Sequence, residues 1–191
     1  MAVGSGKHVA AQAMSDGSYR VYIAVIAPEE QFTNNTLVDL TAENGDVARR
    51  FFLSDPRYLA DWGSAIKDII ANSEGPFRRW PLYHMEPEAL NWPRAPGVAL
   101  LGDAAHVSTP FVGEGVNCAL FDSLQLADKI AQYGTATDDA LERAVGEYEK
   151  DMFERGRSLI ERSNASAALI FAEDPAEFLQ VVTAAKIQEG K

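Results

Sequence analysis

Residues 97–130 hold the side chains with the clearest chemical use. The apolar run at residues 98–101 predicts a short buried strand, which ends at an acidic turn formed by Gly102 and Asp103. In open α/β sheets, ligands contact the loops that follow the carboxyl ends of strands. A carboxylate at that place can accept hydrogen bonds from sugar-like hydroxyl groups. We therefore expect Asp103 to lie at a ligand-binding turn.

A loop with one proline, Pro110, and two glycines, Gly113 and Gly115, follows this turn. Proline fixes one backbone angle, and glycine allows a ligand to approach the backbone closely. From residue 116 to residue 131 apolar side chains recur at helical spacing, which predicts an amphipathic helix. The start of such a helix offers free N–H groups and a positive end, which suit an anionic group or an electron-rich ring edge.

Taken together, these residues resemble a known motif. The pattern comprises Gly102-Asp103-Ala104-Ala105-His106, Pro110, Gly113-x-Gly115-x-Asn117, Asp122 and Leu126. It resembles the second FAD-binding motif of the class A flavoprotein monooxygenases, the aromatic hydroxylases of the para-hydroxybenzoate hydroxylase superfamily. Within that superfamily the tetracycline-inactivating monooxygenases are the most similar. The length and order of the pattern make it specific, whereas a GD pair or a GxG alone is weak.

The resemblance implies an FAD site in this part of the chain. It assigns Gly102 and Asp103 to the ribityl and phosphate region, Pro110 and Gly113 to the side of the isoalloxazine ring, and Gly115, Val116 and Asn117 to its pyrimidine edge. The implied reaction uses NADPH or NADH to reduce FAD, and inserts one oxygen atom into an aromatic or polyketide-like small molecule. The protein then supplies mainly position, a dry pocket and hydrogen bonds.

The sequence lacks a dinucleotide-binding glycine fingerprint. Residues 4–7, Gly-Ser-Gly-Lys, are the nearest candidate, and we interpret them as a flexible start. The chain thus looks like the C-terminal half of such a monooxygenase, without the N-terminal Rossmann part. We expect FAD binding to be weak or dependent on a partner, either an N-terminal FAD-binding chain or a second copy in a homodimer. We also expect a large exposed apolar face where the Rossmann part would dock.

Two other hypotheses stay open at this point. The chain could be a flavin-free derivative of the fold that acts as an isomerase or cyclase, or a non-catalytic binding module. Candidate acid/base groups for the first of these are Arg20, Tyr22, His84 and His106. A structural hydrogen bond is the favoured role for His106. The intact glycine spacing favours the flavin hypothesis, because a protein freed from flavin has no need of bare glycines beside a ring.

The resemblance also implies substrate contacts outside the motif. The strand that contains Arg20 and Tyr22 matches one that lies over the flavin, and a segment that contains Tyr83 matches one that closes the substrate cavity. We therefore expect Arg20, Tyr22, Tyr83 and Phe111 to contact the substrate, with Arg79 as a weaker candidate. A solvated strand face explains Arg20 and Tyr22 equally well.

The remaining patterns predict a mixed α+β fold. They comprise strands over residues 8–13 and 19–26, helices over 45–53 and 56–72, an edge strand at best over 77–85, a loop over 86–96, a long helix from 138, and a last helix from 174 to about 188. We divide the chain into a partial substrate-binding antiparallel sheet with helices (1–96), a flavin-contacting strand-loop-helix (97–133) and C-terminal helices (134–191), which together form one compact unit.

Composition excludes several classes. The 191 residues carry 17 basic and 28 acidic side chains, a net charge of −11, which argues against binding to nucleic acid or to an acidic membrane surface. No apolar run reaches the length of a membrane span. The single cysteine, Cys118, and three scattered histidines give no metal-binding pattern. We expect a cytoplasmic protein and a buried Cys118.

Overall fold

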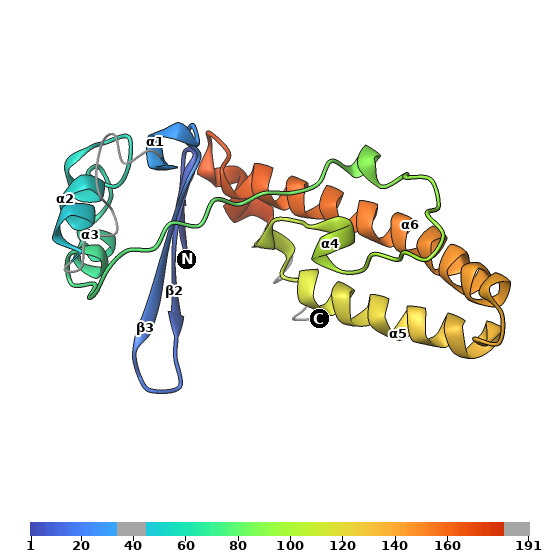
Figure 1. Ribbon diagram of the computed structural model, residues 1–191. Helices are drawn as coiled ribbons and strands as arrows, with labels where there is room; N and C mark the ends of the chain where they lie inside the picture. Colours follow the sequence, from blue (N-terminus) through green and yellow to red (C-terminus); the bar gives the residue numbers. More distant parts are fainter. Residues whose placement is uncertain (34–44, 182–191) are drawn as a thin grey trace, which may run out of the picture. The chain divides into compact units, whose positions relative to one another are not determined.

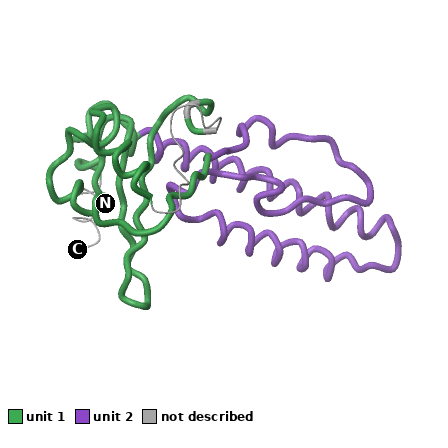
Figure 2. The backbone as a smooth tube through the Cα atoms, turned by 60° about the vertical axis from the view of Figure 1, so that its left-hand side comes forward, with its two compact units in different colours: residues 1–81, 169–191 green, residues 82–168 purple. Residues whose placement is uncertain are grey.

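The computed structural model describes residues 1–33 and 45–181, and its contacts divide the chain into two compact units. Unit 1 comprises residues 1–81 and 169–191, and unit 2 comprises residues 82–168 (Figure 2). The sequence pattern had suggested three segments within one unit, with a boundary after residue 96. That division stays a prediction; by their contacts, residues 82–96 belong to unit 2 together with the candidate flavin-contacting residues.

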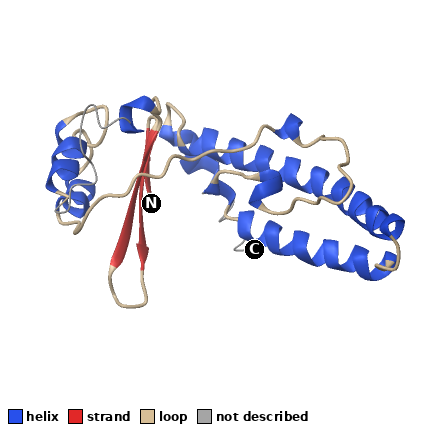
Figure 3. Ribbon diagram, viewed as in Figure 1, coloured by secondary structure: helices blue, strands red, loops and turns tan. Residues whose placement is uncertain are grey.

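Unit 1 contains an antiparallel sheet of β1 (Ala2–Gly4), β2 (Lys7–Ala13) and β3 (Tyr19–Val25), in that order (Figures 1 and 3). Both predicted strands are thus confirmed. The flexible start predicted for residues 4–7 was wrong, because β1 pairs with β2 across this turn. The buried Lys7 ammonium donates hydrogen bonds to the Pro56 carbonyl at 2.8 Å and to Asp61 at 3.2 Å, which fixes the turn to the rest of unit 1.

Short helices cover this sheet with an aromatic core. They are α1 (Glu30–Thr33), α2 (Asp46–Ser54) and α3 (Ser64–Ala71). The buried core residues are Val9, Ala48, Phe52, Tyr58, Leu59 and Ile70. Most of the apolar stripe that predicted the helix over 56–72 packs in or against this core, as expected, whereas Ile69 is 40% exposed.

The predicted helix over 56–72 begins late, at Ser64. Residues 56–62 form turns instead, in which the backbone N–H groups of Tyr58 and Ala60 donate to the Asp55 carbonyl. The Asp55 side chain accepts the Arg57 N–H at 2.8 Å, a local bond that competes with helix formation. The edge strand considered for residues 77–85 does not form, and Pro81 within it has no N–H to donate to a neighbouring strand.

Unit 2 is built from helices and loops. Its elements are η1 (Pro87–Ala89), α4 (Asp103–His106), η2 (Pro110–Val112), α5 (Gly115–Tyr133) and α6 (Asp138–Ile170), whose last two residues belong to unit 1. The predicted motif helix and long helix are confirmed. Figure 1 shows α5 and α6 side by side, and a Lys129–Asp151 ion pair of 3.3 Å joins them. Ala105, Tyr148 and Met152 form the apolar core between the elements.

The predicted strand at residues 98–101 was wrong. The segment has no regular structure, and Val98, Leu100 and Leu101 are exposed to 54%, 38% and 38%. A strand needs a neighbour that pairs with its N–H and C=O groups, and no strand lies beside this segment within the described residues. Apolar character alone could not form it.

At the end of the chain, residues 175–181 are helical, and the rest of the helix predicted to residue 188 lies outside the described residues. The described fold is α+β, as predicted.

Candidate functional site

The acidic turn before α4 requires glycine at its first position. Gly102 has φ 57° and ψ −143°, and a β-carbon there would lie 2.9 Å from the Ala119 methyl group on α5. L-residues avoid this backbone geometry and would also collide with α5. The Gly102 carbonyl accepts the N–H groups of Ala105 and His106 at 2.8 and 2.9 Å, which closes α4. Asp103 therefore stands exposed at the start of α4.

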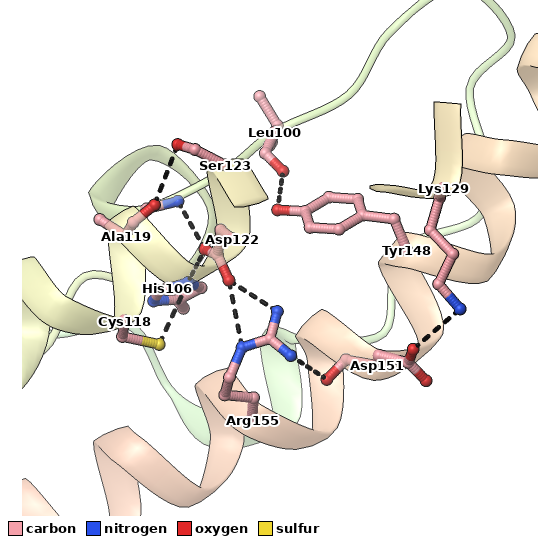
Figure 4. A network of polar contacts seen from close by, with 11 residues as sticks. Leu100, His106, Cys118, Ala119, Asp122, Ser123, Lys129, Tyr148, Asp151 and Arg155 are labelled. Atoms are coloured by element: carbon pink, nitrogen blue, oxygen red, sulfur yellow. Dashed lines mark hydrogen bonds and ion pairs between the residues drawn. The ribbon is translucent and has the colours of Figure 1, made fainter. Parts of the chain in front are cut away.

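Beneath this turn lies a buried carboxylate, Asp122, on α5 (Figure 4). Its Oδ2 accepts the Gly102 N–H at 2.9 Å and faces His106 Nε2 at 2.5 Å. Its Oδ1 accepts two hydrogen bonds from Arg155 on α6, at 2.7 Å from Nη2 and 3.2 Å from Nε. Asp122 and His106 are 0% and 1% exposed. The network thus joins the turn, α4, α5 and α6.

The surroundings of Asp122 keep it ionised. Burial alone would raise the pKa of Asp122, but hydrogen bonds from Arg155, Gly102 and His106 outweigh burial and lower the pKa below its usual value. Burial and the nearby Asp122 charge raise the pKa of Cys118, so its side chain is a thiol near neutral pH. The expected packing role of Cys118 fits this finding, since the thiol is buried.

His106, Cys118 and Asp122 lie close enough to be weighed as metal ligands. One ligand atom from each lies within 4.8 Å of the others. The donor set does not suit a cation, because the Arg155 guanidinium already binds the carboxylate and the cysteine is protonated. Hydrogen bonding within the network accounts for the cluster.

Both ends of the glycine loop are fixed to α6. Ser163 donates its hydroxyl to the Thr109 carbonyl at 2.6 Å and lies 2.8 Å from the Thr109 hydroxyl, which therefore acts as the donor. At the other end, Arg162 forms two hydrogen bonds with Glu114, at 2.7 and 3.0 Å, which lower the pKa of Glu114. Since α6 also carries Arg155, one helix holds the turn and the loop together.

Between these anchors the loop is open to solvent. Pro110, Gly113, Val116 and Asn117 are exposed. Gly113 adopts a left-handed φ of 70°, and a β-carbon placed on it would meet no atom within 4 Å. The first N–H groups of α5, a helix of 19 residues, have no acceptor within the helix. These features fit the FAD ring edge, because a flat group can approach the backbone and meet donors and a positive helix end.

Further predicted site residues lie outside this loop, and His106 is buried. Arg20 and Tyr22 are exposed on β3 of unit 1, where Tyr22 donates its hydroxyl to Gln12 Oε1 at 3.1 Å. Tyr83 and His84 are exposed in unit 2, and His84 Nδ1 lies 3.0 Å from the Met85 carbonyl. His106 is buried beneath the turn, where its Nε2 faces Asp122, the arrangement expected for a structural histidine.

Sequence reasoning missed the residues that hold the loop. Asp122 belongs to the motif, which assigns it no role; the sequence predicts Arg155 on the polar face of the long helix and gives Ser163 no role. A signal existed for Asp122, because it lies four residues after the buried Cys118 on the same helix face. The apolar repeat of the long helix predicted a buried Tyr148, but no signal marked the hydrogen bond that its hydroxyl donates to the Leu100 carbonyl at 3.0 Å.

The sequence matches the model of one protein family, the FAD binding domain, over residues 7–163. The chain therefore belongs to this FAD-binding family. Among described residues, no helix is both long and apolar enough to cross a membrane.

Similar curated proteins are named as monooxygenases or hydroxylases, and some of them are named as FAD-dependent. Monooxygenase asqM of Emericella nidulans is 27% identical over 168 residues, which cover 78% of this chain and 38% of that protein. The FAD-dependent urate hydroxylase of Klebsiella pneumoniae is 29% identical over 174 residues, covering 90% and 40%. The crystal structure of Klebsiella pneumoniae HpxO with FAD and uric acid superimposes with a TM-score of 0.68 at 29% identity, covering 98% of this chain and 42% of that one. The chain thus spans about two fifths of the length of these relatives.

Proposed function

We propose that this chain forms the ring-binding part of an FAD-dependent monooxygenase that hydroxylates an aromatic or polyketide-like small molecule. The observation that carries the proposal is the exposed loop from Pro110 to Asn117, which is open at its surface yet fixed from below by α6. A loop that served only to connect two helices would not need a polar anchor at each end. The flavin-free and binding-module hypotheses lose support, because the matched family is an FAD binding domain and the Klebsiella relative is named an FAD-dependent hydroxylase.

Different residues are proposed to contact different parts of the cofactor. Asp103 would accept hydrogen bonds from the ribityl chain, Pro110 and Gly113 would lie beside the ring, and the α5 N–H groups at Gly115 and Asn117 would donate to its pyrimidine edge. When bound and reduced by NADPH or NADH, FAD supplies the activation of dioxygen, from which one oxygen atom enters the substrate. This chain's residues orient the ring and stabilise negative charge at its edge through the helix end.

Substrate binding is proposed separately for side chains of unit 1 and of unit 2. Arg20 and Tyr22 share one face of β3, and Tyr83 and Phe111 belong to unit 2. A cation and phenol groups suit an aromatic substrate with acidic or carbonyl oxygens. One Klebsiella pneumoniae relative is an FAD-dependent urate hydroxylase, and the similar crystal structure of Klebsiella pneumoniae HpxO holds uric acid, which supports this class of substrate.

A dinucleotide-binding part is proposed to complete the site. Exposed apolar side chains gather around the GD turn and on α5 of unit 2: Val98, Leu100, Leu101, Val116, Leu120, Phe121 and Leu124. Exposed apolar residues of this number mark an interface, and the relatives are more than twice as long as this chain. We propose that a dinucleotide-binding part covers this surface in the cytoplasm; a homodimer is the alternative outcome.

The test is a flavin titration of the chain, followed by the visible spectrum and by the mass in solution. We expect the absorption bands of FAD and of riboflavin to shift on binding and the titrations to saturate. Both flavins should bind weakly and with similar affinity, because the adenosine of FAD makes few contacts with these residues. Asp103→Ala should weaken both, whereas the exposed Asp128→Ala on α5 serves as a matched control. A folded chain whose addition leaves the flavin spectrum unchanged at millimolar flavin would overturn the proposal. A mass twice that of the chain would assign the apolar surface to a second copy.

A further inference from the structure

We propose that Asp122 is a positioning residue for the cofactor: its carboxylate, held by Arg155, fixes the Gly102 turn and thereby the place of Asp103. This inference rests on the proposed flavin function and names the group that prepares the site. Asp122 is 0% exposed, so it acts through the turn and not by contact with the cofactor.

The turn is held at both of its backbone polar groups. The Gly102 carbonyl accepts two N–H groups of α4, and the Gly102 N–H donates to Asp122 Oδ2 at 2.9 Å. A glycine with positive φ has no side chain to restrain it, so these bonds decide its conformation. Because Asp103 follows directly, loss of the Asp122 bond would free the Asp103 carboxylate to move.

The orientation of the Asp122 carboxylate is in turn set from α6. Two partners, Gly102 and His106, contact Oδ2, and two nitrogens of Arg155 bind Oδ1. The Arg155 guanidinium lies 5.0 Å from the Phe121 ring centre, and its side chain is 22% exposed, so it keeps some hydration. Oδ2 thus holds the Gly102 turn and Oδ1 binds Arg155, and both oxygens must accept hydrogen bonds.

Asparagine separates these tasks, because it has one acceptor end and one donor end. In Asp122→Asn the amide must turn its NH₂ group either toward the two donor nitrogens of Arg155 or toward the donor N–H of Gly102, so either choice places a donor against a donor. In the double variant Asp122→Asn/Arg155→Met the guanidinium is gone, so the amide oxygen is free to accept from Gly102. The methionine keeps an apolar stem against Phe121.

The experiment measures riboflavin affinity and the hydrogen-exchange rate of the Gly102 amide in the full chain, with the ion-paired surface change Asp151→Asn as control. For Asp122→Asn we expect affinity to fall about tenfold or more and Gly102 exchange to rise more than that of its neighbours. The double variant should recover most of both losses. Asp151→Asn should change neither.

The outcomes separate this inference from the proposed function. If the original chain binds flavin and both variants bind it equally well, the positioning role is wrong while the proposed function stands. If Asp122→Asn does not fold, the double variant decides. A double variant that folds fully but binds flavin weakly and exchanges the Gly102 amide freely would contradict the predicted recovery, and the inference would be wrong. If the original chain binds no flavin, the proposed function fails first, and the inference fails with it.

Discussion

The two units solve the same problem of stability with different chemistry. Unit 1 is closed by an aromatic and aliphatic cluster in which Phe52 contacts the rings of Phe51, Tyr58 and Phe77 at centroid distances of 5.3, 5.7 and 6.1 Å. Unit 2 buries polar groups, among them Asp122 and His106, beneath its exposed loop. Apolar packing is non-directional, whereas hydrogen bonds fix orientation. The difference teaches that buried polar groups occur where the backbone of a turn and a loop is held in one orientation.

The largest effect is expected from opening the apolar core. Phe52→Ala should lower the free energy of unfolding of unit 1 by about 3–5 kcal/mol, because it leaves a cavity among three rings. Hydrogen exchange of peptides from each unit is the suitable measurement, since a two-unit chain need not unfold in one step. Arg50→Ala, at an exposed position on α2, is the control. Equal loosening of unit 2 would contradict the separate cores.

A smaller loss is expected when one polar anchor of unit 2 is removed. Ser163→Ala should cost about 1–3 kcal/mol, because the buried Thr109 carbonyl and hydroxyl lose their partner. Exchange should rise around Pro110 more than in unit 1, and flavin affinity should fall. Ser158→Ala is the matched control on the exposed face of α6. An unchanged loop after Ser163→Ala would show that the anchor is dispensable.

The units should also differ in their response to acid. Burial and the N-terminal charge lower the pKa of His8 in unit 1, so the unfolded chain binds more protons and unit 1 loses stability as pH falls below 6.5. The net lowering of the pKa of Asp122 gives unit 2 stability that is present above pH 3.8 and is lost as pH falls through the lower folded value.

Hydrogen exchange measured from pH 7 downward should therefore show that unit 1 loses stability first and that unit 2 loses stability at lower pH. His8→Gln should remove the early change and leave the late one. The same order in the His8→Gln chain as in the original would contradict the assignment.

The smallest effect is expected at the surface anchor. Arg162→Ala removes an ion pair with Glu114 whose side chains are 50% and 48% exposed, so it should leave the unfolding transition unchanged within error. Any effect should appear as faster loop exchange at low salt that disappears at high salt. A large, salt-independent loss of stability would show that this pair contributes more than solvent screening allows.

Much of the local structure could be predicted, because it follows from local causes. The 3.6-residue apolar repeat placed α5, and Gly134 with φ 82° ended it. Alternation placed β2 and β3, and Asp16-Gly17 marked their turn. The strand predicted at 98–101 was wrong because a strand is not formed by local causes alone. It needs a pairing partner, which the described residues do not supply.

The sequence by itself determined where backbone can approach a flat ligand, because glycine and proline act at the position where they stand. The order from Gly102 to Asn117 was therefore enough to indicate a flavin family. Only the tertiary structure decided what holds that backbone in place. Arg155 and Ser163 lie 33 and 54 residues from their partners Asp122 and Thr109, and no periodicity links residues so far apart. Their pairing arises when α6 packs against α5 and buries the polar groups, whose desolvation then requires that each donor meet an acceptor.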